Sequence, residues 1–153
     1  MTSASGARAA ELTRELEASV GYVLRRAQLA VFADFIASQS GAVVRPGQFA
    51  VLLVIGMHAG LTQNQLCEAL AIKRANLVAM LDEFESLGFV RRVPCSRDGR
   101  AKRLHLSTAG AKVLSQAVDA QKRHEARITA ALGAIGRRQL IDLLNRLRTL
   151  PAS

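Results

Sequence analysis

The apolar residues of this 153-residue chain recur at steps of three and four positions over long stretches, which is the periodicity of amphipathic α-helices. One such stripe predicts a long helix over about residues 11–41. Pro46 suits the first turn of a second helix that ends near Met57. Near the end of the chain, a narrower stripe consists of Leu140, Leu143, Leu144 and Leu147. The pattern therefore predicts a mainly helical protein.

Two shorter helices and two strands are predicted between these long helices. Thr62 suits the N-cap of a helix over residues 62–69, because its hydroxyl can accept a hydrogen bond from a following backbone amide. A second helix covers residues 73–87, and alternating apolar and polar positions then predict a β-hairpin over residues 89–106. Two crossed helices followed by a basic hairpin indicate a winged helix-turn-helix over about residues 46–107. The expected fold class is mainly α with a small β-hairpin wing.

The second of these short helices carries candidate DNA contacts at its start and on its outward face. Lys73 and Arg74 are placed for phosphate contacts, and Asn76 can offer both a donor and an acceptor to the edge of a base. The small apolar residues of the same face, which could contact thymine methyl groups, are Ala75, Val78 and Ala79. Thr62 and Gln63 would add phosphate contacts through exposed backbone amides. The alternative is a plain helix with small residues on its surface.

The charge of the chain indicates a polyanionic partner such as double-stranded DNA. The formal net charge is +9, and a cationic surface attracts nucleic acid. Much of this charge lies in the hairpin, where the cations are Arg91, Arg92, Arg97, Arg100, Lys102 and Arg103. Asp98, the single anion there, can accept a hydrogen bond from Arg100 and hold that guanidinium extended toward the minor groove of A·T-rich DNA. A solvated loop with an ordinary surface ion pair is the alternative interpretation.

The sequence contains no pattern that is typical of catalysis, metal binding or membrane insertion. His58, His105 and His124 are scattered without metal-ligand spacing. Cys67 and Cys95 form no zinc motif, although a redox switch is an alternative for either thiol. No run of 18 apolar residues is present, and the N-terminus lacks the apolar core of a signal peptide. We therefore expect a cytoplasmic protein that is not an enzyme and that binds no metal, cofactor or membrane.

Three motifs in the middle of the chain carry a resemblance to a known family. They are Leu61-Thr62-Gln63-x-x-Leu66, Leu87-Gly88-Phe89-Val90-Arg91-Arg92, and Asp98-x-Arg100 followed by Leu106-Ser107-x-x-Gly110. In these motifs the chain resembles the MarR family of bacterial transcriptional regulators, and the similarity covers nearly its whole length. The resemblance implies a homodimer, one winged helix per subunit and a pseudo-palindromic operator. The family usually has a second arginine where Gly99 stands, so Arg97 is a candidate for the tip of the wing.

The resemblance also implies how the chain is divided. It implies a single domain over residues 1–153, with interlocked dimerisation helices over about residues 11–41 and 108–150. The candidate dimer contacts are Leu12, Leu16, Leu140, Leu143, Leu144 and Leu147. Packing of the C-terminal leucines onto the core of their own subunit is the alternative. The family's effector pocket lies between the dimerisation helices and the winged helix, and its expected lining residues are Tyr22, Arg26, Phe49 and Leu53.

These features predict a ligand-responsive, DNA-binding regulator of transcription. A homodimeric repressor would occupy its operator with two recognition helices roughly 34–36 Å apart, the separation of successive major grooves. The family resemblance implies that a small aromatic or phenolic acid changes this separation and releases the DNA. A winged helix that serves as a protein–protein interaction module, without sequence-specific DNA binding, is the alternative, and the basic hairpin argues against it.

Overall fold

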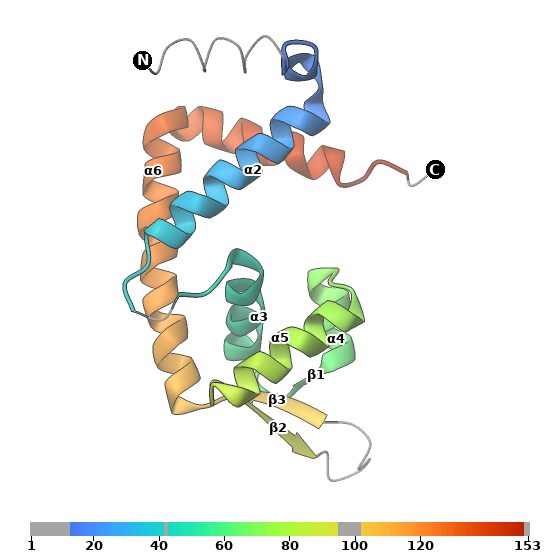
Figure 1. The fold of residues 1–153 in the computed structure, drawn as a ribbon, viewed down its shortest axis with the longest axis vertical. Coiled ribbons are helices and arrows are strands. Elements are labelled where there is room, and N and C mark those ends of the chain that lie inside the picture. Colours follow the sequence, from blue (N-terminus) through green and yellow to red (C-terminus); the bar gives the residue numbers. More distant parts are fainter. Residues whose placement is uncertain (1–12, 42, 95–101, 152–153) are drawn as a thin grey trace.

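The computed structural model describes residues 13–41, 43–94 and 102–151 and shows a mainly helical chain with one small sheet (Figure 1). In chain order the elements are η1 (Leu16–Ala18), α2 (Val20–Ala37), α3 (Pro46–Met57), β1 (Leu61–Thr62), α4 (Gln63–Leu70), α5 (Arg74–Ser86), β2 (Val90–Pro94), β3 (Lys102–Leu106) and α6 (Thr108–Leu147). The first half of α6 runs along one side, and α3, α4, α5 and the sheet lie beside it (Figure 1). The predicted fold class is confirmed.

The sheet has three strands rather than the two of the predicted hairpin. β3 is central and pairs antiparallel with β2 on one side and β1 on the other. β1 consists only of Leu61 and Thr62, which pair with Leu104 and Arg103. A strand of two residues leaves no alternating pattern in the sequence, so it could not be predicted. The Arg103 guanidinium also donates to the Gly60 carbonyl over 2.8 Å, which attaches the hairpin to the start of the helix-turn-helix.

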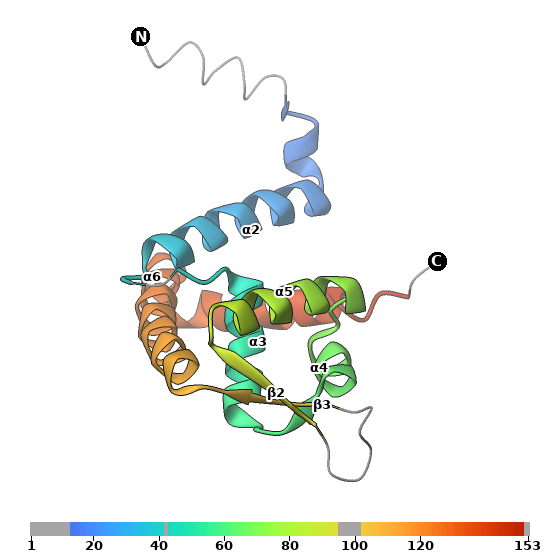
Figure 2. The same ribbon diagram turned by 60° about the horizontal axis from the view of Figure 1, so that its bottom comes forward.

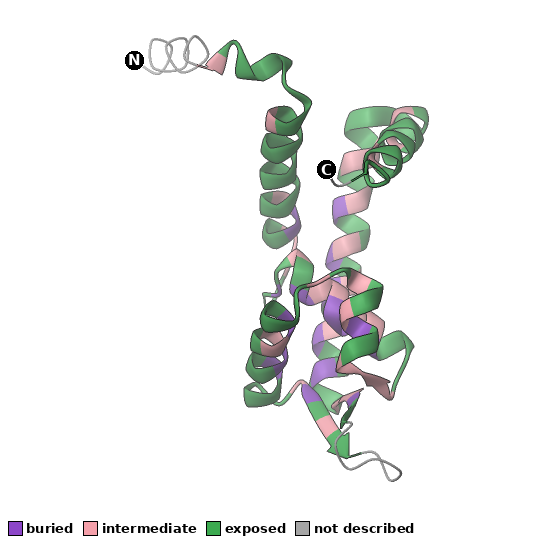
Figure 3. Ribbon diagram, turned by 90° about the vertical axis from the view of Figure 1, so that its right-hand side faces the viewer, coloured by how far each residue is buried: buried purple, intermediate pink, exposed green. Residues whose placement is uncertain are grey.

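The hydrophobic core lies within the winged helix. Its buried side chains come from α3, α4, α5, the two hairpin strands, the first half of α6 and the link before α3; they are Val44, Val51, Leu52, Ile55, Leu66, Leu77, Leu81, Phe84, Val90, Leu104, Val113 and Ala117. The inward face of α5 consists of Leu77, Leu81 and Phe84. Figure 3 shows the buried residues gathered in this half of the molecule, whereas the helices that extend beyond it are mostly exposed.

The start of α6 lies unusually close to the hairpin. Ser107 caps α6 by accepting from the Gly110 amide over 3.0 Å, and its hydroxyl donates to the Gly88 carbonyl over 2.5 Å. The Ser107 amide donates to the Phe89 carbonyl over 2.9 Å. A Cβ at position 110 would lie 2.0 Å from that same carbonyl oxygen. The motif Ser107-x-x-Gly110 therefore fixes α6 against the wing, and the close approach requires glycine.

Both long helices differ from the sequence prediction. The first was predicted as one helix over residues 11–41, but α2 begins only after Ser19 and ends at Ala37. Ser19 is extended (φ −89°, ψ 122°), in line with the preference of serine for helix starts over helix interiors. α6 changes direction at Gly133, whose φ of 70° is not helical. We call residues 108–132 and 134–147 the first and second arms of α6; the second arm runs across the molecule (Figure 1).

Candidate nucleic-acid interface

The helix-turn-helix consists of α4, a tight turn and α5 (Figure 2). Thr62 caps α4, because its hydroxyl accepts from the Gln65 amide over 3.3 Å while the Gln65 side chain accepts from the Thr62 amide over 2.9 Å. The helix ends at Ala71, which has a left-handed conformation (φ 50°). The Ile72 amide then donates to the Cys67 carbonyl over 3.2 Å. The predicted N-cap is confirmed, and the turn brings the chain directly into α5.

α5 presents a small, polar face away from the core. Its exposed residues at and near the helix start are Lys73, Arg74, Ala75, Asn76 and Ala79, whereas Val78 is half-buried. Lys73 is the N-cap of α5 and Arg74 is its first residue. Both cationic side chains therefore begin next to the free backbone amides of the first turn. Cationic side chains next to such amides favour an anionic ligand. The roles of these residues in DNA contact stay predictions.

A polar cavity of about 340 Å³ lies between α5, the start of α4 and the hairpin. Its lining residues are Thr62, Gln63, Asn64, Arg74, Val78, Asp82, Arg92, Lys102 and Leu104. Five of them, namely Thr62, Gln63, Arg74, Val78 and Lys102, are among the predicted DNA contacts. The fold therefore brings residues from three separate segments of the sequence to one surface.

The base of the wing is tied to α5 by two ion pairs. Arg92 donates to Asp82 over 2.6 Å and to Glu85 over 2.9 Å, and its side chain is only 16% exposed. Arg92 is thus neutralised within its own chain, which corrects the sequence analysis, where it was counted among the cations left for a polyanion. Asp82 and Glu85 are three residues apart and so share one face of the helix. That spacing was a signal the sequence analysis did not use.

The tip of the wing lies outside the described residues, and with it the candidates Arg97, Asp98 and Arg100 and the thiol of Cys95. Lys102 is described: it is exposed at the first position of β3 and pairs in register with Pro94. The contribution of the wing arginines to DNA binding stays a prediction.

An apolar groove of about 880 Å³ lies between α2 and the second arm of α6. Its lining residues are Glu17, Ala18, Ser19, Val20, Val23, Leu24, Ala27, Leu140, Leu143, Leu144, Arg146, Leu147, Thr149 and Leu150. Four of the predicted dimer contacts are among them. Leu16 is also exposed, and Leu12 lies outside the described residues. Because Leu140, Leu143 and Leu147 are exposed, the described part of the chain does not close the groove.

The four predicted effector-pocket residues lie on two helices. Tyr22 and Arg26 are one turn apart on α2, and the Arg26 guanidinium carbon lies 5.9 Å from the centre of the Tyr22 ring. Phe49 and Leu53 are one turn apart on α3, and the Phe49 ring packs 5.5 Å from the ring of Phe35. None of the four lines either of the two cavities described above. Their place in an effector pocket stays a prediction.

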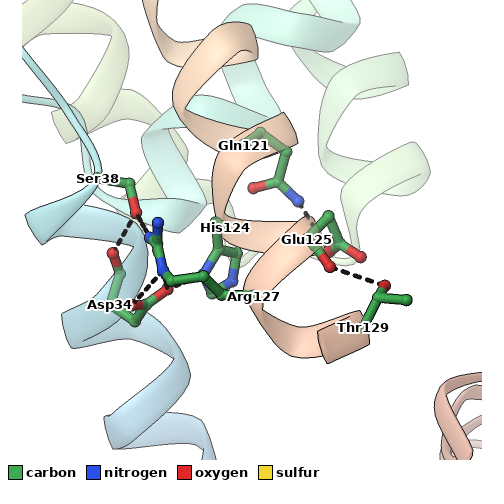
Figure 4. Close-up of polar contacts among 7 residues, drawn as sticks. All are labelled: Asp34, Ser38, Gln121, His124, Glu125, Arg127 and Thr129. Atoms are coloured by element: carbon green, nitrogen blue, oxygen red, sulfur yellow. Dashed lines mark hydrogen bonds and ion pairs between the residues drawn. The ribbon is translucent and has the colours of Figure 1, made fainter. Parts of the chain in front are cut away.

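A polar cluster that the sequence analysis missed joins α2 to the first arm of α6 (Figure 4). His124 is buried, with only 3% of its surface exposed. Its Nδ1 atom lies 2.5 Å from a carboxylate oxygen of Asp34. Arg127 binds the other carboxylate oxygen through Nε over 2.9 Å. Hydrogen bonds from Arg127 and then His124 lower the pKa of Asp34 from 3.8 to about 2. The three-residue spacing of His124 and Arg127 on one helix face was the signal available in the sequence.

Comparisons with known proteins agree with this architecture. The sequence model of the MarR family matches residues 44–101. A candidate transcriptional regulatory protein for the hcr operon of Thauera aromatica is 33% identical over 131 residues, which are 84% of this chain and 78% of that protein. The chain belongs to the MarR family.

Two solved structures of a transcriptional repressor, CouR, are similar to this MarR-family chain. CouR bound to a 23-mer DNA duplex superposes with a TM-score of 0.82 and 36% identity, over 89% of this chain and 96% of the other. CouR bound to p-coumaroyl-CoA has the same TM-score with 35% identity, over 90% of this chain and 96% of the other. The resemblance inferred from the three sequence motifs is thereby confirmed.

The MarR-family chain is a winged-helix transcriptional regulator, and the matched region runs from the start of the core at Val44 into the wing. The family and the similar proteins are regulators rather than enzymes. Within the described ranges, no group of three or more histidine, cysteine or acidic side chains is arranged to hold a metal ion. No helix in those ranges has the length and apolar character that a membrane span requires.

Proposed function

We propose that this chain forms a homodimeric repressor that binds double-stranded DNA through α4, α5 and the hairpin. The observation that carries the proposal is the similarity to CouR bound to a 23-mer duplex, with 36% identity over 89% of the chain. In such a complex each winged helix meets one half of a pseudo-palindromic operator, and α5 lies in the major groove. Occupation of the operator would block access to the promoter.

The exposed start of α5 supports this proposal. Lys73 and Arg74 would neutralise phosphates together with the free amides of the first turn, which positions the helix. Asn76 would form paired hydrogen bonds with a base, and adenine is the preferred partner of this side chain. The small side chains Ala75 and Ala79 allow the helix to approach the bases closely but supply few polar contacts. Part of the specificity would therefore depend on the shape of the DNA.

The exposed apolar surface supports a dimer. Many of the large hydrophobic residues that the described chain leaves exposed lie on α2 and the second arm of α6, including Val20, Val23, Leu24, Leu140, Leu143 and Leu147. The groove is lined mostly by apolar side chains, and large exposed apolar patches commonly mark an interaction site. A second copy related by a twofold axis would cover it with the same residues, and leucines at i, i+3, i+4 and i+7 suit a helix–helix seam.

We further propose that an aromatic acyl-CoA thioester releases the DNA. CouR binds p-coumaroyl-CoA, the thioester of a phenolic acid, and this agrees in class with the aromatic or phenolic effector expected from the family resemblance. Tyr22, Phe49 and Leu53 would contact the aromatic ring, and Arg26 an anionic group. Release requires that the effector bind more tightly to a dimer whose α5 separation misfits DNA than to the dimer that fits it.

Gel-shift titration with duplex fragments from the intergenic DNA upstream of the protein's own gene tests DNA binding. A retarded complex is expected at low salt, and the logarithm of its affinity should fall linearly with the logarithm of salt concentration. An unrelated duplex of equal length and base composition is the matched control and should bind more weakly. No complex with either duplex at low ionic strength would contradict the proposal and favour a protein–protein interaction module.

The effector is tested by adding p-coumaroyl-CoA to the preformed DNA complex. Coenzyme A alone and free p-coumarate are the matched controls, because each contains one half of the thioester. The thioester should weaken DNA binding at concentrations at which neither half has an effect. Equal effects of the thioester and coenzyme A would show that the aromatic group is not recognised.

A further inference from the structure

The buried and hydrogen-bonded contacts of α2 with the rest of the chain lie mainly at its last turn. Phe35 is the one buried residue of α2, while the earlier part of the helix flanks the open groove and extends beyond the winged helix (Figure 3). Just after α2, the Gln39 side chain binds the amide and the carbonyl of Val44 over 2.8 and 2.7 Å, which fixes the link to α3. The direction of the whole helix therefore depends on the contacts of this turn.

At this turn Asp34 is held from two positions on α6 (Figure 4). His124 contacts one carboxylate oxygen over 2.5 Å, and Arg127 binds both oxygens, through Nε over 2.9 Å and through Nη2 over 3.0 Å. Ser38 donates to the Asp34 carbonyl over 2.5 Å and accepts a hydrogen bond from Arg127. Arg123 donates to the Ser38 carbonyl over 2.9 Å. The last turn of α2 is thus hydrogen-bonded to three side chains of one α6 segment.

The geometry of these contacts fixes the orientation of α2 as well as its distance from α6. A planar guanidinium that binds both carboxylate oxygens constrains the plane of the carboxylate, which an apolar contact does not. The Phe35 ring stands edge-on to the His124 ring, with 5.8 Å between the ring centroids. It also packs against the Phe49 ring of α3, with 5.5 Å between the centroids. The cluster therefore lies where α2 and α6 meet the first helix of the winged helix.

We propose that Asp34, His124, Arg127 and Ser38 form a positioning cluster that sets the angle between α2 and the winged helix. This angle would in turn set the separation of the two α5 helices, so the inference rests on the proposed DNA-binding dimer. α2 has 18 residues and is about 27 Å long, so a rotation of about 10° at its fastened end would move the other end by about 5 Å. That other end lines the apolar groove in which a second copy would pack.

The test compares half-site spacing preference between wild type and Asp34→Asn. The probe is a duplex that the wild-type protein selects from a randomised pool, together with versions in which one base pair is inserted or deleted between the half-sites. Asparagine keeps the size of the side chain but removes the charge that binds Arg127. We expect the affinity ratio between the selected and the altered spacings to fall roughly fivefold or more in the variant. The salt dependence should be unchanged, because the cluster is not part of the DNA-contacting surface.

Asp119→Asn is the matched control. It makes the same chemical change on α6 at an exposed ion pair with Lys122, and its spacing preference should equal that of wild type. Arg127→Gln is a second variant for the case that Asp34→Asn does not fold, because it leaves the buried His124–Asp34 contact intact. Light scattering and thermal unfolding would verify that each variant is a folded dimer.

The two proposals fail in different ways. A wild-type protein that selects no duplex would refute the proposed function. A wild-type protein that selects a duplex, with folded variants that keep the wild-type spacing ratio, would overturn the positioning cluster alone, even if all affinities fell together. A uniform fall is what a merely structural role would give, since lower stability reduces binding to every spacing equally.

Discussion

The winged helix and the two helices that extend beyond it differ in whether their apolar residues are buried by the same chain. In the winged helix, Leu52, Leu66 and Leu77 are fully buried by neighbours from the same chain. In α2 only Phe35 is buried, and the second arm of α6 leaves Leu140, Leu143 and Leu147 exposed together with other large apolar residues. The winged helix buries its apolar residues within one copy, whereas α2 and the second arm of α6 leave an apolar groove open, which the second copy of the proposed dimer would cover.

This contrast could not be read from periodicity. Leu140, Leu143, Leu144 and Leu147 have the spacing of a buried stripe, and so do the core residues of α3. Apolar periodicity predicts which face of a helix is buried, but not whether that face packs against the same chain or against another. Exposure in the folded chain separates the two cases, and it supports the second copy that the proposed function requires.

The largest expected effect is on dimer formation. Leu143→Gln removes an apolar side chain that lines the groove, and a twofold dimer would lose this contact in both copies. Burial of the exposed half of each leucine is worth about 1 kcal/mol or more, and each buried glutamine amide without a partner costs about 1–3 kcal/mol. The dimerisation free energy should therefore weaken by roughly 3–6 kcal/mol over the two copies. Sedimentation equilibrium measures this change.

Leu87→Gln is the matched control, because Leu87 and Leu143 have the same exposed fraction of 53% in the single chain. Leu87 lies at the C-terminal end of α5, away from the groove. Its substitution should leave the dimer intact. If both variants weakened dimerisation equally, the groove would not be the specific dimer surface, and the contrast with the winged helix would be wrong.

The next largest effect is on the stability of the winged helix itself. Gly110→Ala places a Cβ 2.0 Å from the Phe89 carbonyl oxygen, so α6 or the hairpin must shift. We expect a loss of about 3 kcal/mol in the free energy of unfolding, at the upper end for overpacked sites. Urea denaturation measures it, and Gly47→Ala is the control, since a Cβ there meets no atom within 4 Å. Unchanged stability of Gly110→Ala would contradict the close contact.

A smaller effect is expected on DNA recognition by the exposed face of α5. Asn76→Ala should cost about 1–3 kcal/mol of binding free energy and relax the preference at one base position. Lys73→Ala should instead weaken binding to all sequences alike and reduce the salt dependence by about one unit of slope. Affinity titrations over a set of single-base variants of the selected duplex compare the two. A uniform loss in the Asn76 variant would reassign that side chain to the phosphate backbone.

The smallest expected effect is the loss of stability at low pH that results from protonation of Asp34, where α2 meets α6. The pKa of Asp34 is about 2 in the folded chain, below the ordinary value of 3.8, so folding favours the ionised carboxylate. Its contribution to stability is fully present above about pH 4 and is lost as the pH falls through about 2. Wild type should therefore lose stability over this window more steeply than Asp34→Asn, as measured by denaturation midpoints at several pH values. Parallel curves for the two proteins would argue against the ion pair.

The sequence predicted the winged helix better than the parts around it. The N-cap at Thr62, the bounds of α5 and the hairpin follow from local patterns, since capping, periodicity and alternation involve residues close in the chain. The break at Ser19 and the turn at Gly133 each depend on the conformation of a single residue, to which apolar periodicity does not respond. The contacts of Asp34 with His124 and of Arg92 with Asp82 depend on tertiary packing, so the sequence showed the residues but not their pairing.

The central claim is that two copies of this chain bind one duplex, and the mass of the complex tests it most directly. Light scattering on the free protein and on its complex with the selected duplex gives the number of chains in each. We expect a free protein of twice the 16.4 kDa chain mass and a complex with two chains per duplex. A monomer at micromolar concentration that forms no complex with any duplex at low ionic strength would contradict it.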